Sequence, residues 1–241
     1  ELLNILDISP SIINKARLEY IRKIVPKKNN ERIETTLSEG YVEKYKTPKS
    51  IAFGLNKQHD IAWEERVWAI FAKMGYHYTN VIRNYKLSYG NDLKQIDVCA
   101  ADSETILIIE CKSSNISRIV DHKEEILSWG SMIEGLRNSS QRIIPGKQKI
   151  AFIWATNNCI LNEPSKKALQ TVGFYSFNQN DISYYEQMSS HIGTAAKYQL
   201  SAKLFSGQKI PELQNINKIP AISGKLGGKQ YYLFSIDRNS V

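Results

Sequence analysis

Residues 95–112 read QIDVCAADSETILIIECK, and this stretch decides the fold. Its two halves, residues 95–101 and 105–111, are rich in Ile, Val and Leu, which favours β-strands. Asp102, Ser103 and Glu104 lie between the halves and are residues common in turns. The stretch therefore predicts a β-hairpin.

The length of the loop fixes which residues face each other across this hairpin. If Ser103 and Glu104 form a two-residue loop, Asp102 pairs with Thr105, and Asp97 lies directly opposite Glu110. Opposed residues of an antiparallel pair share a face, with Cβ atoms about 5 Å apart. Side chains alternate along a strand, so Lys112 shares the face of Glu110. A slip of one residue would break this alignment.

Two carboxylates and an ammonium group at one place suggest phosphodiester chemistry. A hard divalent cation such as Mg²⁺ prefers oxygen ligands, which Asp97 and Glu110 supply. Lys112 can stabilise charge on a phosphate, or orient or deprotonate a water molecule. The alternative is structural: the three residues are solvated charges of a surface hairpin, and Lys112 only pairs with Glu110.

At these residues the chain resembles the PD-(D/E)xK nuclease superfamily. Ile96-Asp97 takes the place of Pro-Asp, and Glu110-Cys111-Lys112 takes the place of ExK, in the ID…ECK form typical of Mrr and Holliday-junction-resolvase families. The resemblance implies a restriction-endonuclease-like α/β fold, in which helices flank a mixed central β-sheet. It also implies catalysis by Asp97, Glu110 and Lys112. The cofactor it implies is Mg²⁺, which Mn²⁺ can replace, held by Asp97, Glu110 and the backbone carbonyl of Cys111.

The same family places a glutamate on a preceding helix. Residues 60–78, DIAWEERVWAIFAKMGYHY, read as an amphipathic helix that ends near Gly75. Glu64 lies on the apolar stripe of Val67, Trp68 and Phe71, whereas Glu65 lies off it. We therefore expect Glu64 to be the helix carboxylate, as a catalytic and metal-binding residue. The alternative is that both are first-turn acids favoured by the helix dipole.

The remaining pattern divides the chain into three parts. We expect an N-terminal helical and irregular extension at 1–55, the nuclease-like domain at 56–190, and a tail with helices and a β-hairpin at 191–241. The other predicted elements of the chain are helices at about 1–25, 118–136, 162–172, 181–192 and 194–205, and strands at 149–156 and 174–177. The tail faintly resembles the start of a DGQHR domain, which would imply that a further C-terminal domain is absent from this chain.

The composition favours an anionic partner. The net charge is +8 and the pI is about 9.2. Candidate nucleic-acid contacts are Gln95, Ser113, Ser114, Lys27 and Lys28. The alternatives are that the two serines cap a following helix, and that the early basic residues form a solvated helix face.

Other patterns narrow the functional class. Three cysteines without CxxC spacing and four histidines without zinc-ligand spacing indicate a reducing, cytoplasmic setting and no zinc site. No apolar stretch has the length of a membrane span.

Taken together, these features predict a metal-dependent DNA endonuclease acting in bacterial restriction or anti-phage defence. RNA stays open as a substrate. The resemblance implies a homodimer, because double-strand cutting by this fold usually needs two active sites. The alternative is a catalytically silent nuclease-fold module that binds nucleic acid.

Overall fold

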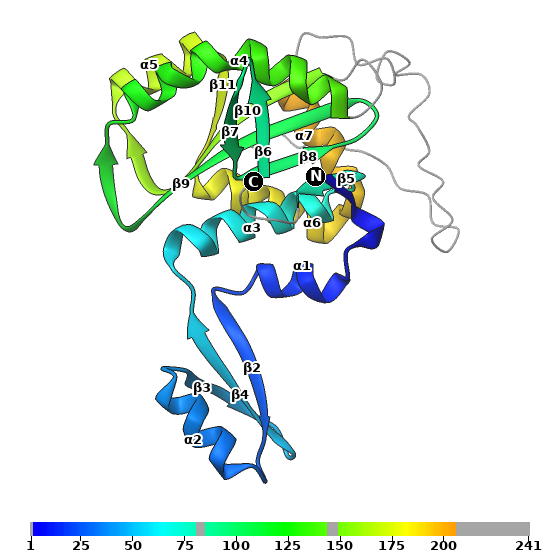
Figure 1. The fold of residues 1–241 in the computed structure, drawn as a ribbon, viewed down its shortest axis with the longest axis vertical. Coiled ribbons are helices and arrows are strands. Elements are labelled where there is room, and N and C mark those ends of the chain that lie inside the picture. The colour runs from blue at the N-terminus through cyan, green and yellow to red at the C-terminus, as the bar shows by residue number, and fades with distance from the viewer. Residues whose placement is uncertain (1, 81–84, 144–148, 206–241) are drawn as a thin grey trace.

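The computed structural model describes residues 2–80, 85–143 and 149–205. It is an α/β fold with a mixed central sheet flanked by helices, from which a small lobe projects (Figure 1). In order across the sheet, the strands are β1 (Leu2–Asn4), β5 (Tyr78–Asn80), β8 (Val98–Ala101), β9 (Thr105–Val120), β10 (Lys149–Leu161) and β11 (Phe174–Phe177). The first four strands pair antiparallel, whereas β10 runs parallel to both β9 and β11.

Two hydrophobic layers cover the two faces of this sheet. One layer contains residues of α1 (Pro10–Ala16), α3 (His59–Lys73), α6 (Gln179–Ile192) and α7 (Ala196–Leu204). The other layer contains residues of α4 (Lys123–Ile143), α5 (Glu163–Val172) and the hairpin of β6 (Tyr85–Tyr89) and β7 (Asp92–Ile96). In Figure 1 the α4 and α5 layer lies above the sheet, and α3 and α6 lie below it. The sheet is therefore buried on both sides, as its near-continuous apolar strands require.

The small lobe corrects the prediction of helix over residues 1–25. Helix α1 begins after Ser9 with Pro10 in its first turn, as the pattern indicates, but it ends at Ala16. Residues Tyr20–Pro26 form strand β2, which pairs with β4 (Ser50–Asn56), and β4 pairs with β3 (Val42–Lys46). Helix α2 (Asn30–Ser38) covers one face of this three-stranded sheet. The prediction rested on apolar residues at helical spacing, but two of these residues, Tyr20 and Ile24, lie on strand β2, where Ile24 is 51% exposed.

The helix predicted at 118–136 begins later than expected. Strand β9 continues through the serines to Val120, and α4 starts at Lys123 with the Asp121 side chain accepting its first N–H at 3.0 Å. Ile119, expected to point inward, is 74% exposed. Ser113 and Ser114 are therefore strand residues and do not cap a helix.

The C-terminal helices follow their sequence signals. Asn162 caps α5, Pro164 lies in its first turn, and Gly173 ends it with φ of +83°. Helix α6 starts two residues before the predicted position, because Asn178 is its cap and Asp181 completes a capping box from the third position. The division of the chain at residues 55 and 190 stays a prediction, and the predicted tail hairpin lies outside the described residues.

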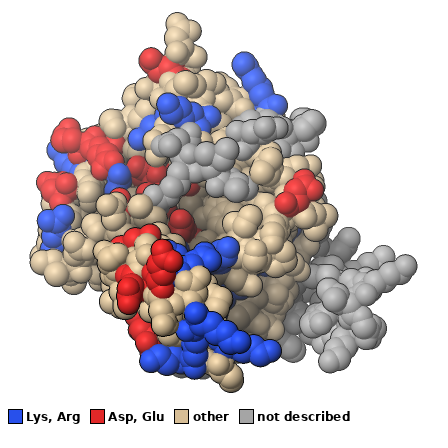
Figure 2. All heavy atoms as spheres, turned by 60° about the horizontal axis from the view of Figure 1, so that its bottom comes forward, with Lys and Arg blue, Asp and Glu red and all other residues tan. Residues whose placement is uncertain are grey.

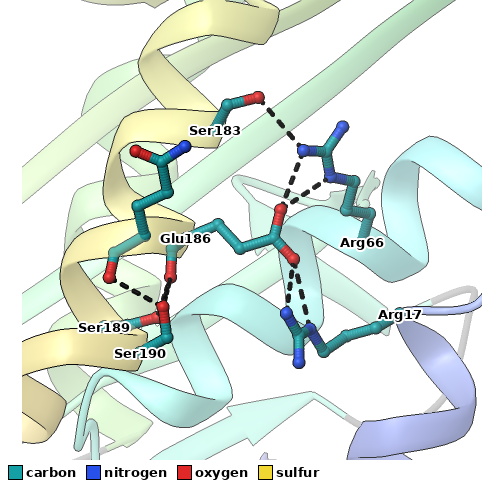
Figure 3. Close-up of polar contacts among 7 residues, drawn as sticks. Arg17, Arg66, Ser183, Glu186, Ser189 and Ser190 are labelled. Atoms are coloured by element: carbon teal, nitrogen blue, oxygen red, sulfur yellow. Dashed lines mark hydrogen bonds and ion pairs between the residues drawn. The ribbon is translucent and has the colours of Figure 1, made fainter.

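An ion-pair cluster joins three helices beneath the sheet. Glu186 of α6 accepts hydrogen bonds from Arg17, at the end of α1, and from Arg66 of α3, each with a shortest distance of 2.8 Å (Figure 3). Arg66 also donates to the Ser183 hydroxyl at 3.1 Å. Burial would raise the pKa of Glu186, but the two guanidinium groups outweigh it and lower this pKa. The cluster fixes α1 and α6 against the helix that carries Glu64.

Candidate active site

The hairpin has the predicted register. Strands β8 and β9 pair Val98 with Ile109 and Ala101 with Ile106. Beyond Ala101, the Asp102 N–H donates to the Thr105 carbonyl at 2.9 Å, so Ser103 and Glu104 form the loop. Extending the same register past Val98 brings Asp97 opposite Glu110.

The hairpin turn is held from outside by a buried ion pair. The Asp102 carboxylate accepts the N–H groups of Glu104 and Thr105, both at 2.8 Å, and pairs with Lys197 of α7 at 2.8 Å. The Asp102 side chain is 2% exposed and that of Lys197 is 14% exposed. Burial would raise the pKa of Asp102, but Lys197 and the two N–H donors lower it. The charged pair therefore locks the loop that sets the register.

Asp97 lies where the chain passes from one sheet to another. Strand β7 pairs only with β6, and β8 enters the central sheet, so Asp97 sits at the break between them. Asn80 holds the break, because its amide donates to the Asp97 carbonyl at 2.9 Å and accepts the Cys99 N–H at 2.7 Å. The Asp97 carboxylate accepts the Cys111 N–H at 2.7 Å. The carboxylate is thereby fixed against the backbone between Glu110 and Lys112.

Glu110 and Lys112 form a partly buried ion pair on the α4 side of the sheet. Lys112 Nζ lies 2.9 Å from Glu110 Oε1 and 2.6 Å from Glu125 Oε1 of α4. It also lies 5.4 Å from the ring centroid of Trp154, the β10 residue paired with Glu110. The second carboxylate oxygen, Glu110 Oε2, is buried and has no hydrogen-bond partner among the described residues. The site therefore has one oxygen that is ready to accept a ligand.

The pKa values of the charged groups in this site differ from those of solvent-exposed side chains. Burial and then the Asp97 charge raise the pKa of Glu110 to about 7. Burial raises the pKa of Asp97 to about 6, against the hydrogen bond from Cys111, and the Glu64 charge adds to the rise. Burial would lower the pKa of Lys112, but Glu110 and Glu125 outweigh it and raise this pKa above its usual value. The arrangement differs from a solvated hairpin, and perturbed carboxylates of this kind are typical of functional sites.

Glu64 approaches the site from the opposite layer of the fold. Its neighbours on the predicted stripe, Val67, Trp68 and Phe71, are all buried. Its charge raises the pKa of Asp97 and, after burial and Asp97, that of the Cys111 thiol. Glu65 instead pairs with Lys57 at 2.5 Å. These contacts favour Glu64 over Glu65 as the helix carboxylate.

The predicted nucleic-acid contacts do not gather at this place. Gln95 is exposed on β7, opposite Lys86. Ser113 follows Lys112 on β9, and the buried Ser114 accepts the Asn158 amide through its carbonyl at 3.1 Å. Lys27 and Lys28 are exposed beyond the end of β2, at the end of the small lobe remote from the central sheet (Figure 1).

Sequence reasoning missed four side chains around the site. Lys94 of β7 lowers the pKa values of both Asp97 and Glu110, and its Nζ lies 4.5 Å from the Trp129 ring centroid. Glu125 contacts Lys112, and His122 Nδ1 lies 3.2 Å from Glu125 Oε2. The fourth is Trp154. Of these four, only Lys94 lies in an element that the sequence indicates. Gly90-Asn91 between two segments of alternating polarity is typical of a hairpin, which here is formed by β6 and β7.

The residues present fit a hard cation. Among the described residues, no three His, Cys, Asp or Glu side chains already form a group that could hold a metal ion. Asp97 and Glu110 nevertheless offer two carboxylates with raised pKa values, and Glu110 Oε2 is buried without a partner. A cation would relieve the repulsion between these charges and occupy the free oxygen. Mg²⁺ and Mn²⁺ match such an oxygen-only donor set.

We expect the metal-free protein to become more stable as the pH falls from 8 to 5.5. A carboxyl group whose pKa is raised by folding binds its proton more tightly in the folded state, so its repulsion is relieved as the pH falls through that pKa. The pKa values of about 7 for Glu110 and about 6 for Asp97 place the change in this range. Urea unfolding with a chelator present should show a gain on the order of 1 kcal/mol relative to Glu110→Gln. Equal pH dependence in the two proteins would contradict the burial of Glu110.

The comparisons with known proteins are sparse. No family model matches the chain, and no curated protein matches it. One similar solved structure is described as a protein of unknown function, AF1548, with 16% identity and a TM-score of 0.38 over 59% of this chain and 78% of that one. Another is protein VC1899 from Vibrio cholerae, with 12% identity and a TM-score of 0.36; 80% of this chain matches about half (53%) of that one.

None of the described helices is long and apolar enough to cross a membrane. Function is therefore argued from the site itself.

Proposed function

We propose that the protein is a metal-dependent endonuclease of the PD-(D/E)xK type, which hydrolyses phosphodiester bonds in DNA. One observation supports the proposal: the Asp97 carboxylate accepts the Cys111 N–H at 2.7 Å, and the neighbouring residues Glu110 and Lys112 pair at 2.9 Å. The buried Glu110, the partly buried Asp97 and a lysine at this spacing form the set that the ID…ECK resemblance requires. A mixed sheet flanked by helices agrees with a restriction-endonuclease-like fold.

Each residue of the set has a distinct role. Asp97, Glu110 and the Cys111 carbonyl would hold Mg²⁺ or Mn²⁺, and Glu64 would contribute from α3. When bound, the metal would polarise a phosphate oxygen and lower the pKa of a coordinated water. Lys112 has a raised pKa, so it is cationic at neutral pH and suits stabilisation of negative charge on phosphorus better than abstraction of a proton.

The biological setting follows from the proposed chemistry. We propose DNA as the partner because the chain is basic, with a net charge of +8. A role in bacterial restriction or anti-phage defence, and a homodimer for double-strand cutting, belong to the same proposal. RNA is the alternative substrate to be compared directly.

A cleavage assay tests the function. Purified protein with Mg²⁺ or Mn²⁺ should nick or cut DNA, and EDTA should stop the reaction because the carboxylates need the cation. The substrate panel should contain unmodified, methylated and phosphorothioated DNA together with RNA.

The outcome separates two functions. Cleavage that requires the metal supports the nuclease. If no DNA or RNA in the panel is cut but nucleic acid is still bound, the protein is instead a catalytically silent binding module with a nuclease-like site.

A further inference from the structure

The small lobe has one covered and one open sheet face. Helix α2 covers the face that carries Val25, Ile51 and Phe53, which form their own buried cluster. On the other face, the middle strand β4 has only small side chains: Ala52 opposite Ile24 and Tyr45, and Gly54 opposite Arg22 and Val42. Ile24, Val42 and Tyr45 on this open face are 51%, 53% and 41% exposed. Large apolar side chains are thus presented to solvent on a platform of small residues.

Two cation–aromatic pairs lie across this platform. Arg22 of β2 lies 5.2 Å from the ring centroid of Tyr45 of β3 and donates to its hydroxyl. Lys44 Nζ of β3 lies 4.9 Å from the ring centroid of Tyr20 of β2. Glycine is needed beneath the second pair, because a Cβ at Gly54 would lie 2.6 Å from both Lys44 and Tyr20. Two cations and two aromatic rings therefore lie over strand β4 on its open face.

The charge of the open face has one sign. The strand residues described on this face include Arg22 and Lys44 but no Asp or Glu, by the register of β2, β4 and β3. Two acidic residues of the lobe form ion pairs on the α2 side, where Glu39 contacts Lys23 at 2.7 Å and Glu43 contacts Lys46 at 3.1 Å. Among the described residues, Arg22 and Lys44 have no carboxylate partner. In Figure 2, in which the bottom of Figure 1 comes forward, basic side chains lie beside acidic ones on the forward surface.

We propose that the open face of the β2–β4–β3 sheet binds single-stranded nucleic acid. The exposed Tyr45 ring and the exposed side chains of Ile24 and Val42 suit unstacked bases, and Arg22 and Lys44 suit the phosphates between them. A duplex exposes mainly phosphate to a flat surface and would leave Ile24, Val42 and Tyr45 without contacts. The inference that this strand is a substrate of the chain rests on the proposed nuclease function.

The lobe is fixed relative to the candidate active site. Strand β4 leads directly into α3, the helix that carries Glu64. At this junction Lys57 donates to the carbonyls of Lys15 and Ala16 at 3.1 and 3.2 Å and pairs with Glu65 at 2.5 Å. The Lys57 side chain is 6% exposed, so the junction is packed. A strand bound on the open face is therefore held at a defined position with respect to Asp97 and Glu110.

Fluorescence anisotropy tests this binding site without any cleavage. A labelled oligothymidylate is titrated with the full chain in EDTA, so that the metal-dependent reaction cannot contribute. Exchanging both Arg22 and Lys44 for Gln should weaken binding about tenfold or more and reduce its salt dependence. Ile24→Glu is a second, independent variant at an exposed position, for the case that the double exchange lowers stability. Its carboxylate should weaken binding by repelling the phosphates. The matched control is Lys46→Gln, on the same strand but on the α2 side, which should leave affinity within about twofold.

The outcomes separate this proposal from the nuclease proposal. Unchanged affinity in both the double variant and Ile24→Glu, or binding of duplex only, overturns the open face as the site. No binding of any oligonucleotide at low salt overturns it too and points to a protein partner for the exposed apolar residues. If the variants lose binding and the wild type does not cleave, the binding site on the open face is supported and the nuclease proposal is wrong. If the wild type cleaves and the variants bind normally, the nuclease proposal is supported and the binding site on the open face is wrong.

Discussion

Replacing Lys112 with methionine should lower the rate of DNA cleavage by about 100-fold to 1,000-fold, the usual effect of removing one group that stabilises transition-state charge. Lys112 is the cation nearest to Glu110, at 2.9 Å, and its pKa is raised, so its charge is present at neutral pH. Methionine is an unbranched side chain of similar volume to lysine, and the fold should therefore persist. The measurement is the initial cleavage rate in Mg²⁺, with circular dichroism to confirm folding.

The control for Lys112 is Lys123→Met. Lys123 lies in the first turn of α4 and is exposed, and its ammonium group pairs with the exposed Glu124 at 3.5 Å, so loss of this charge should not change the rate. If Lys112→Met cleaves as fast as Lys123→Met, Lys112 is a structural partner of Glu110 and Glu125, and its assignment to catalysis is wrong.

Replacing Asp102 with alanine should destabilise the protein by roughly 3–5 kcal/mol, the range for breaking a buried ion pair by removing one partner. The substitution leaves Lys197 with a buried charge and removes the acceptor of two backbone N–H groups in the hairpin loop. For a chain of this size the melting temperature should fall by about 10 °C or more. Differential scanning calorimetry at neutral pH would measure both quantities.

Ser103→Ala is the matched change for Asp102, because Ser103 occupies the exposed neighbouring position in the same loop. It should alter stability by no more than about 0.5 kcal/mol. A similar melting temperature for Asp102→Ala and Ser103→Ala would show that the ion pair with Lys197 does not hold the hairpin.

The hairpin and its register could be predicted because the signals are local. Three turn residues between two apolar runs leave one short loop, and strand alternation then assigns Asp97, Glu110 and Lys112 to one face. The buried stripe on α3 could be predicted in the same way, since Val67 and Phe71 recur at helical spacing, whereas the role of Glu64 stays a prediction.

The missed features depend on contacts distant in sequence. Strand β9 continues past Lys112 because Ser113 and residues 118–120 pair with β10, and the serine-rich composition of 113–117 does not indicate this. Glu125 reaches Lys112 only because α4 packs on the face that carries it. Residues 20–26 carry Ile at positions that suit either a helix or a strand, and pairing with β4 decides for the strand.

The central claim is that Asp97 and Glu110 together hold one divalent cation. Isothermal titration calorimetry of the metal-free protein with Mn²⁺ tests it most directly, because it requires no knowledge of the substrate. The wild type should show one saturable site for each chain, and both Asp97→Asn and Glu110→Gln should abolish it. Wild-type Mn²⁺ binding in both variants would contradict the claim.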